Sequence, residues 1–295
     1  MNSLPANAER ISNLAGRMRE ACQALAPSEM LHPDRHGVAR LCDRLLAVLF
    51  PGCFTSDYIG GAPLDTYVHS HLAELEAQLL DLIARAAAGK NAGQIRDLVL
   101  TAMEELPRVR GLVGTDVLAA FHNDPAAPDV ATIVLSYPSI EALAVQRFAH
   151  CLYRLGIPVI PRMMTEVVHG RTGIDIHPGA TIDESFFIDH GTGVVIGETS
   201  RIGKHCVLYQ GVGLVAWNPL AKDEHGELQR GAVNKRHPDL EDHVTIYAGT
   251  TILGGDTIIG HHSIIGGNVW LTRSVEPYSA VTIKDPELNI RQRRR

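Results

Sequence analysis

The sequence predicts an α+β fold in which an N-terminal all-α helical domain precedes a left-handed parallel β-helix of hexapeptide repeats. Two observations support this prediction. Apolar residues recur at three- and four-residue steps through the first part of the chain, and at six-residue steps after Gly173. The change of period divides the chain into an α-helical domain over residues 1–170, a β-helix over 171–284 with an inserted loop at 215–238, and a charged tail at 285–295.

The helical pattern is clearest in residues 67–86, where Leu72, Leu75, Leu79 and Ile83 recur on one face of an expected amphipathic helix. Comparable patterns, separated by proline and glycine residues, occupy 6–26, 36–49, 93–105, 115–122, 138–155 and 158–169. We interpret these apolar stripes as core positions rather than as cofactor contacts.

A six-residue spacing of aliphatic residues replaces the helical pattern after Gly173. This period is typical of a parallel β-helix, in which each aliphatic side chain fills the interior from one flat face. The repeat runs in four phases: Ile176, Ile182, Ile188 and Val194; Ile196, Ile202, Leu208 and Leu214; Leu240, Ile246, Ile252 and Ile258; and Ile259, Ile265 and Leu271. The second phase begins after a shift of two residues, and the fourth after a shift of one.

Between the second and third phases lies a polar, charge-rich segment that breaks the repeat, the inserted loop at 215–238. A loop of this length within a compact domain is either disordered or functional. We interpret it as a loop beside a site, with Arg236 and His237 where the chain returns to the β-helix.

Composition and charge argue against several classes of protein. A formal net charge of −6 disfavours a general nucleic-acid-binding protein, which needs a basic surface. The five cysteines are scattered and include no CxxC pair, so neither a disulfide framework nor a zinc knuckle is predicted. No signal-peptide pattern and no apolar segment long enough to span a membrane is found, so we expect a cytoplasmic protein.

Polar residues inside the repeat indicate where chemistry takes place. Asp189 and His190 directly follow Ile188, and Asp175 directly precedes Ile176. With three hexapeptides per coil, residues about eighteen apart stack, so Asp175 and His190 are expected on adjacent coils. A carboxylate that bonds one imidazole nitrogen leaves the other free to take a proton, as in a general base. The alternative is a histidine that only hydrogen-bonds the backbone at a corner of the β-helix.

Four segments together resemble the signature of the serine O-acetyltransferases. They read Asp-Ile-His-Pro at 175–178, Asp-His-Gly-Thr-Gly at 189–193, Ile-Gly-Glu-Thr at 196–199 and Arg-His-Pro at 236–238. Their order and the 15-residue spacing from Asp175 to His190 both match, and the resemblance covers roughly residues 115–284. The six-residue repeat alone would indicate only a broad superfamily of acyltransferases.

The resemblance implies that His190 is the catalytic base, that Asp175 supports it, and that His237 lies at the reacting centre. In the implied mechanism His190 removes the proton of the serine hydroxyl as this group attacks the thioester of acetyl-CoA. The imidazolium then protonates the departing thiolate, without a covalent enzyme intermediate and without a metal. Positioned proton transfer of this kind contributes about 10²- to 10⁴-fold to a rate.

Binding residues are implied in the same way. Asp124 and Asp189 resemble ligands of the substrate ammonium, and Arg236 resembles the ligand of its carboxylate, which a guanidinium fork holds well. The expected contacts of acetyl-CoA are Gly211, Ala216, Tyr247, Ala248, Gly249, Gly266 and Gly267. For the CoA phosphates the candidates are Lys222 and Lys235, with plain solvation of these lysines as the alternative.

The sequence departs from the family pattern around the loop. Family members commonly carry a Leu-Gly-Gly turn where this chain has Gly213-Leu-Val-Ala216, and the segment before Arg236 is longer than in the compact members. These features indicate a longer-loop branch of the family.

The resemblance also implies how the chain assembles. The family forms homotrimers with active sites between neighbouring β-helices, or hexamers made of two trimers. Many members bind O-acetylserine sulfhydrylase through a C-terminal isoleucine, whereas this chain ends in Arg295, so we do not expect that complex. Neither nucleic acid nor a membrane is an expected partner.

Three other functions compete with this one. The same fold acetylates other small hydroxyls or amines, such as those of sugars, although Asp124, Asp189 and Arg236 suit the paired charges of an amino acid. A zinc enzyme similar to the γ-class carbonic anhydrases shares the β-helix, but His237 and His243 lack the ligand spacing of that class. The third alternative is a trimeric scaffold without catalytic activity.

Overall fold

The computed structural model describes residues 4–23, 32–54, 63–87, 89–218, 222, 225–227 and 234–284. The chain divides into two compact units, Met1–His32 and Pro33–Arg295. The first unit contains the helix α1 (Leu4–Gln23), on which Ile11, Leu14 and Met18 are each more than half exposed. The remainder of the fold belongs to the second unit.

Helices form the first part of the second unit. They are α2 (Arg35–Leu49), α3 (Leu64–Ala86), α4 (Ala92–Glu104), α5 (Leu106–Asn123), α6 (Val130–Ser136), α7 (Pro138–Arg154) and α8 (Ile160–Thr172). Several begin at a side-chain cap, since Asp34 accepts a hydrogen bond from the Gly37 amide and Asn91 forms a capping box with Gln94. Helix α8 ends at Gly173, whose φ of 73° is the left-handed conformation that glycine adopts without strain.

The helices predicted from the apolar spacing are confirmed within a few residues. Two differences stand out. The structure extends the helix expected at 115–122 back to Leu106, because Pro107 in the first turn needs no amide hydrogen bond. It also adds α6, whose seven residues are too few to show a helical period. Among the described helices none has both the length and the apolar character that a membrane span requires.

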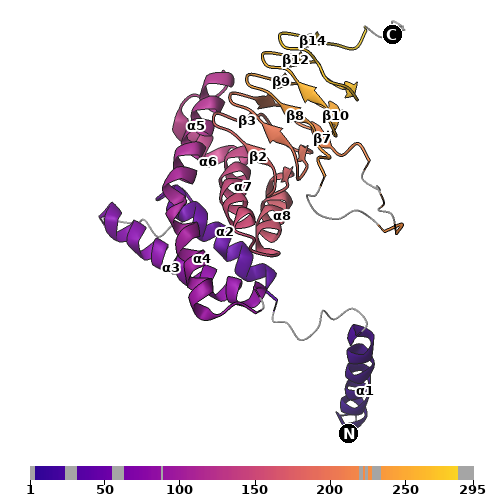
Figure 1. Cartoon of the computed structure of the whole chain (residues 1–295). Helices are drawn as coiled ribbons and strands as arrows, with labels where there is room; N and C mark the ends of the chain where they lie inside the picture. Colours follow the sequence, from indigo (N-terminus) through magenta and orange to yellow (C-terminus); the bar gives the residue numbers. More distant parts are fainter. Residues whose placement is uncertain are drawn as a thin grey trace, which may run out of the picture. The chain divides into compact units, whose positions relative to one another are not determined.

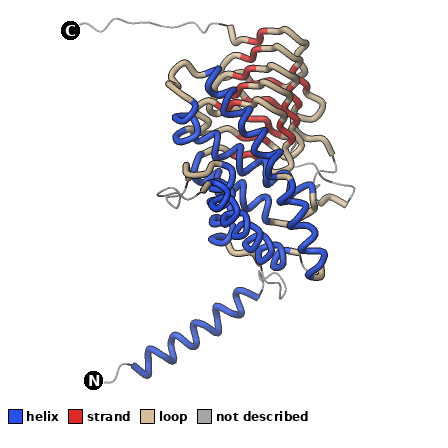
Figure 2. The backbone as a smooth tube through the Cα atoms, turned by 90° about the vertical axis from the view of Figure 1, so that its left-hand side faces the viewer, coloured by secondary structure: helices blue, strands red, loops and turns tan. Residues whose placement is uncertain are grey.

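Short parallel strands form the second part of this unit, a left-handed β-helix (Figures 1 and 2). They are β1 (Asp175–Ile176), β2 (Thr181–Ile182), β3 (Phe187–Ile188), β4 (Val195–Ile196), β5 (Arg201–Ile202), β6 (Val207–Leu208), β7 (Gly213–Val215), β8 (Asp239–Leu240), β9 (Thr245–Ile246), β10 (Thr251–Leu253), β11 (Ile258–Ile259), β12 (Ile264–Ile265), β13 (Trp270–Leu271) and β14 (Ala280–Val281). They make three sheets: sheet A (β1-β4-β7-β10-β13), sheet B (β2-β5-β8-β11) and sheet C (β3-β6-β9-β12-β14). The fold class predicted from the two periods is thus confirmed.

The first coil is two residues longer than the next, which agrees with the two-residue shift of the repeat before Ile196. Asp175 pairs with Val195, twenty residues later, whereas Val195 pairs with Gly213, eighteen residues later. Val194 was expected to continue the spacing of Ile188, but the next strand position after Ile188 is Ile196, and Val194 fills the interior two residues before it. The two extra residues therefore lie in the corner between β3 and β4, which contains Asp189 and His190.

Two edges of the β-helix carry most of the candidate site residues. The His190 edge, where the chain passes from sheet C to sheet A, consists of residues 189–194, 209–212, 247–250 and 266–269. The Arg236 edge, where it passes from sheet A to sheet B, consists of residues 177–180, 197–200, 254–257 and the inserted loop, which leaves after β7 and returns at β8. The loop residues 219–221, 223–224 and 228–233, like the predicted tail at 285–295, lie outside the described residues.

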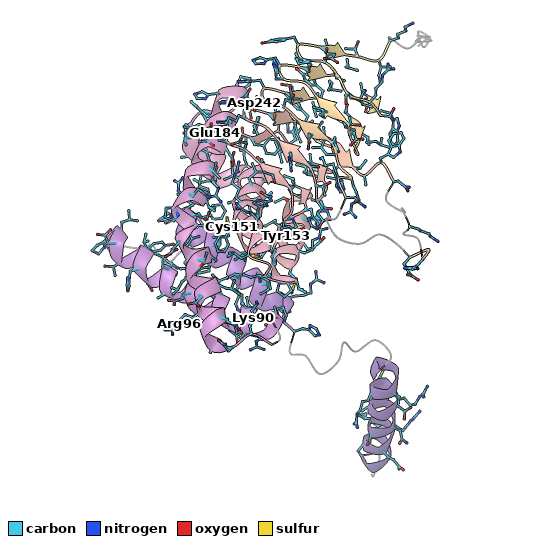
Figure 3. The ribbon with its side chains drawn as sticks, viewed as in Figure 1. Lys90, Arg96, Cys151, Tyr153, Glu184 and Asp242 are labelled. Carbon is cyan, nitrogen blue, oxygen red and sulfur yellow. The ribbon has the colours of Figure 1, made fainter. Side chains whose placement is uncertain are left out.

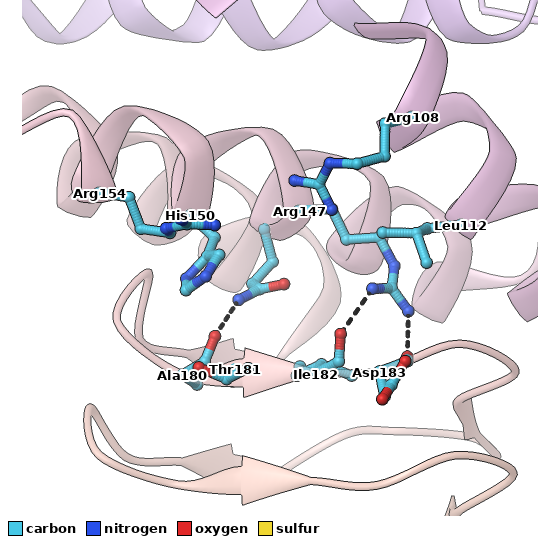
Figure 4. A pocket seen from close by; sticks show the side chains of 10 residues that line it. Arg108, Leu112, Arg147, His150, Arg154, Ala180, Thr181, Ile182 and Asp183 are labelled. Carbon is cyan, nitrogen blue, oxygen red and sulfur yellow. Dashed lines mark hydrogen bonds between the residues drawn. The ribbon is translucent and has the colours of Figure 1, made fainter. Parts of the chain in front are cut away.

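A buried ion pair joins the helices to the first coil. Arg147 of α7 donates to both carboxylate oxygens of Asp116 of α5 at 2.7 and 2.8 Å, and to the carbonyls of Ile182 and Asp183 at 2.9 and 2.8 Å. The Asp116 carboxylate also accepts the Phe186 amide at 3.0 Å. Figure 4 shows the bonds of Arg147 to the coil, beside a cavity of about 230 Å³. Helix α7 thus links the helical core to the β-helix core.

Loss of this ion pair should destabilise the protein strongly. The Asp116→Ala variant leaves the Arg147 charge buried and unpaired, which should lower the free energy of unfolding by about 3–5 kcal/mol. The matched control is Asp81→Ala, which removes the exposed pair of Asp81 with Arg85 and should change stability little. Urea denaturation followed by circular dichroism measures both, and equal losses in the two variants would contradict the prediction.

Candidate active site

His190 projects from the long corner of the His190 edge. Its side chain is 70% exposed and its φ is 58°, so the backbone turns sharply at this residue. Asp189 is mostly buried, with 18% of its side chain exposed, and its Oδ1 lies 3.9 Å from Nε2 of His190. Gly191 and Gly193 have φ values of 87° and 82°, a conformation that larger residues adopt only with strain. The corner therefore presents an accessible imidazole beside a carboxylate.

The helical part contributes Asp124 to the same place. Asp124 ends α5, where its Oδ1 accepts the Ala126 amide at 2.8 Å and its Oδ2 accepts the hydroxyl of Tyr137. The Tyr137 hydrogen bond, followed by that of Ala126, lowers the pKa of Asp124, and the nearby charge of His190 adds a smaller effect. The same bond raises the pKa of Tyr137 to about 12. The structure thus places Asp124 near Asp189 and His190, within range of their electrostatic effects, and keeps its carboxylate ionised.

Tyr137 is the partner of Asp124 that sequence reasoning missed. It immediately precedes α7, and its hydroxyl points at Asp124 rather than into the core. Neither apolar spacing nor a motif marks it, since a tyrosine before a proline is an ordinary way to begin a helix.

Most of the residues expected to contact acetyl-CoA lie at the His190 edge. Those at this edge are Gly211, Tyr247, Ala248, Gly249, Gly266 and Gly267. Tyr247 stacks on Tyr209 with ring centroids 4.9 Å apart. Gly249 has a φ of 71°, and a Cβ there would lie 2.4 Å from Oδ1 of Asn268. Ala216 is the exception, because it follows β7 and belongs to the Arg236 edge.

Asp175 begins β1 one coil below Val195, yet its carboxylate faces α8. Its Oδ1 accepts a hydrogen bond from Arg162 at 3.2 Å. Within the described residues no hydrogen bond joins Asp175 to His190, so the predicted contact between them is not formed in this chain. The physical reason is Arg162, a cation within reach that the strand pattern could not reveal. The catalytic role of Asp175 stays a prediction.

Asp175 also belongs to a group of metal-ligand type. Among the described residues, Glu166, His169 and Asp175 place ligand atoms within 4.8 Å of one another. Arg162 forms ion pairs with both Glu166 and Asp175, so its guanidinium already balances the two carboxylates. This arrangement favours an ion-pair cluster over a metal centre.

Arg236 and His237 lie at the Arg236 edge. Nη2 of Arg236 forms an ion pair with Glu198, and its Nε is buried without a hydrogen-bond partner in the described part of the chain. His237 is only 8% exposed. Burial lowers its pKa from 6.5 to about 4, and the charges of Arg236 and Lys235 add to this effect. The imidazole is therefore neutral above pH 4.

Lys235 is held by protein atoms. Its Nζ donates to the Thr199 carbonyl at 2.7 Å and to Oδ1 of Asp239 at 2.6 Å, and also to the His237 carbonyl. Of the two lysines considered for the CoA phosphates, Lys235 is thus neither free for a phosphate nor simply solvated. Its role is to hold the end of the loop against β8.

The two groups of site residues occupy different edges of one chain. Sheet A separates the His190 edge from the Arg236 edge, and among the described residues no hydrogen bond or ion pair links Asp189 or His190 to Arg236 or His237. A single copy of the chain therefore presents an acidic half-site with the candidate base at one edge and a cationic half-site at the other.

Known proteins resemble this chain over most of its length. No family model matches it. The chain is 42% identical over 263 residues to a plasmid-encoded serine acetyltransferase of Synechococcus elongatus, covering 85% of this chain and 81% of that protein. Serine acetyltransferase 1 of Entamoeba histolytica, solved with L-cysteine, is 38% identical with a TM-score of 0.73 over 83% of this chain and 86% of that one. A serine acetyltransferase solved with CoA is 25% identical with a TM-score of 0.56, over 84% and 96% of the two chains.

The lowered pKa of His237 predicts how stability depends on pH. A histidine that is kept neutral by the fold stabilises it above pH 6.5, and this contribution is lost as the pH falls from 6.5 towards 4. The unfolding free energy of the His237→Gln variant should therefore fall less steeply over this range than that of the natural protein. Denaturant titrations at several pH values measure the slopes. The control His69→Gln, at an exposed site on α3, should keep the natural slope, and an unchanged slope in His237→Gln would refute the prediction.

Proposed function

Because the chain belongs to the serine acetyltransferase family, we propose that it transfers the acetyl group of acetyl-CoA to the hydroxyl of L-serine, giving O-acetylserine for cysteine biosynthesis. One observation carries the proposal: the exposed imidazole of His190 lies beside two carboxylates, Asp189 and Asp124, at the edge that also holds the expected CoA contacts. The free thiols of the described cysteines are compatible with a cytoplasmic enzyme.

Serine would bind through both of its charges. Its ammonium fits between Asp189 and Asp124, whose ionised form is favoured by the Tyr137 hydroxyl. Its carboxylate fits Arg236, whose guanidinium is oriented by Glu198. The relative solved with L-cysteine supports a site for a small amino acid of this size.

The transfer needs one base and no covalent intermediate. His190 takes the proton of the serine hydroxyl while its oxygen attacks the acetyl carbonyl carbon. The carbon–sulfur bond then breaks, and the His190 imidazolium returns the proton to the departing thiolate, which leaves O-acetylserine and CoA. Asp175 would assist only after release from Arg162, since its carboxylate is engaged there.

Acetyl-CoA would lie along the His190 edge. Small residues at successive corners, including Gly211, Gly249 and Gly266, leave the backbone accessible to the pantetheine arm. The stacked rings of Tyr209 and Tyr247 form an apolar wall beside it. The relative solved with CoA supports this cofactor as the acetyl donor.

The active enzyme would be a homotrimer or a hexamer of two trimers. The His190 and Arg236 half-sites lie at separate edges of one chain, so a neighbouring copy must supply the second half. Closed rotational symmetry brings the His190 edge of each copy against the Arg236 edge of the next.

Turnover with different acceptors tests the proposed substrate. Release of the CoA thiol from acetyl-CoA, measured with serine, homoserine, threonine and amino sugars, should be fastest with serine. His190→Ala should lower kcat with serine by about 10²- to 10⁴-fold because the base is lost. The matched control is His205→Ala, which removes another exposed histidine in a left-handed corner and should leave turnover unchanged. Turnover of a sugar but not of serine would overturn the proposal.

Mixed oligomers test whether the site is shared between copies. His190→Ala and Arg236→Gln, each expected to be nearly inactive alone, should regain activity when co-expressed with different tags and purified as mixed oligomers. Some interfaces then pair an intact His190 edge with an intact Arg236 edge. The control pair, His190→Ala with Asp189→Ala, damages the same edge in both copies and should not recover. Recovery in both pairs, or in neither, would argue against a shared site.

A further inference from the structure

The turn Gly197–Glu198–Thr199 contacts both Arg236 and His237, although neither the motif nor the mechanism assigns it a role. We propose that this turn is a positioning element that fixes His237 as the neutral Nε2–H tautomer and orients Arg236, so that His237 acts only as a hydrogen-bond donor to the bound substrate. The inference rests on the proposed function for the identity of that substrate. The tautomer and the orientation rest on the geometry alone.

Thr199 determines the tautomer of His237. Its hydroxyl oxygen accepts the backbone amides of Arg236 at 2.9 Å and of His237 at 3.0 Å. Both lone pairs of the hydroxyl are then occupied, so its proton is directed to Nδ1 of His237, 2.9 Å away. The Thr199 amide donates to the same Nδ1 at 3.1 Å. Two donors converge on Nδ1, which must therefore be the acceptor, and the ring proton is on Nε2.

Nε2 of His237 is available to a ligand. Within the described residues it makes no hydrogen bond, whereas Nδ1 makes two. Protonation at Nδ1 would break both bonds in a buried environment beside the cations Arg236 and Lys235, which agrees with the strongly lowered pKa of the ring. The Nε2–H group of His237 can donate a hydrogen bond to a carboxylate or an oxyanion, but the ring is poorly suited to take up a second proton.

Glu198 orients Arg236, the residue that precedes His237. Its Oε2 forms the ion pair with Nη2 of Arg236, and its Oε1 accepts the hydroxyl of Tyr153 at 2.9 Å. Tyr153 lies on α7, where Figure 3 labels it between the helices and the coils. Because both oxygens of Glu198 are engaged, the guanidinium is tied through the turn to the helical part of the chain.

Two glycines leave the space that this packing requires. A Cβ at Gly197 would lie 1.9 Å from Cδ2 of His237, and a Cβ at Gly254 would lie 2.1 Å from the carbonyl oxygen of Arg236. Any larger side chain at either position would displace the imidazole or the backbone that carries it. The glycine of the Ile-Gly-Glu-Thr motif is thus explained by the close approach of His237.

The ring tautomer can be measured without any substrate. Nitrogen-15 NMR of the histidine-labelled full-length protein at pH 7 distinguishes a ring protonated at Nε2 from one protonated at Nδ1 or at both nitrogens. The His237 signals are assigned by their loss in His237→Gln. The expected result is the neutral Nε2–H form. A neutral Nδ1–H form or an imidazolium at pH 7 would overturn the inference, whichever acceptor the enzyme acetylates.

Kinetics of two matched variants test the positioning role. Thr199→Ser keeps the hydroxyl and should leave the KM for serine close to its natural value. Thr199→Val has the same shape without the hydroxyl and should raise that KM roughly tenfold, with a smaller effect on kcat, because the hydroxyl hydrogen bonds that position Arg236 and His237 are lost. Equal KM values in the two variants would overturn the positioning role.

Glu198→Gln provides a second test if Thr199→Val fails to fold. The amide oxygen of the introduced glutamine still accepts from Tyr153, but the ion pair with Arg236 is lost, so the KM for serine should again rise. An unchanged KM would contradict the role given to Glu198. NMR could show the expected tautomer while neither the natural protein nor the variants acetylate serine. In that case the proposed function is wrong and the tautomer assignment stands.

Discussion

The ion pair between Arg147 and Asp116 fixes the geometry on which the site depends. Asp116 lies on α5, two turns before that helix ends at Asp124, and Arg147 binds the carbonyls of the turn that leads into β3 and His190. The position of Asp124 relative to the His190 corner is therefore set by one buried contact. Removing both charges from water costs several kcal/mol for each ion, so the pair contributes orientation more than net stability.

The six-residue period and the helical period predicted the fold because both come from burial, which repeats along the chain. The lengths and conformations of the β-helix corners were harder to predict, because they depend on hydrogen bonds and backbone φ angles rather than on hydrophobic burial. The sequence showed the two-residue shift before Ile196 but left Val194 in the spacing of Ile188, whereas both extra residues lie in the corner after Ile188. Asp175 and Tyr137 show the same limit: their partners, Arg162 and Asp124, come from distant elements whose approach depends on how the helices pack.

His190 and His237 differ in exposure and in hydrogen bonding, the two features that distinguish a general base from a hydrogen-bond donor. His190 is 70% exposed on a strained corner and makes no hydrogen bond among the described residues, so its ring is accessible, as the proposed role of base requires. His237 is 8% exposed, accepts two donors at Nδ1 and is surrounded by cations, so its neutral form persists. The two environments therefore suit the different roles proposed for the two histidines, which composition or spacing alone would not distinguish.

The division of the proposed site between two edges also bears on the choice of substrate. In this proposal Asp124 and Asp189 at one edge would bind an ammonium, and Arg236 with His237 at the other would bind a carboxylate, with sheet A between them. Neither edge alone would distinguish serine from a simple amine or a simple acid. In the proposed oligomer, where the edges of neighbouring copies meet, only a ligand that carries both charges at the right separation would satisfy both, and a sugar hydroxyl would leave Arg236 and the two carboxylates unpaired, at a large cost in binding free energy. Under this proposal, assembly of the oligomer and choice of substrate would both follow from the same separation of charge.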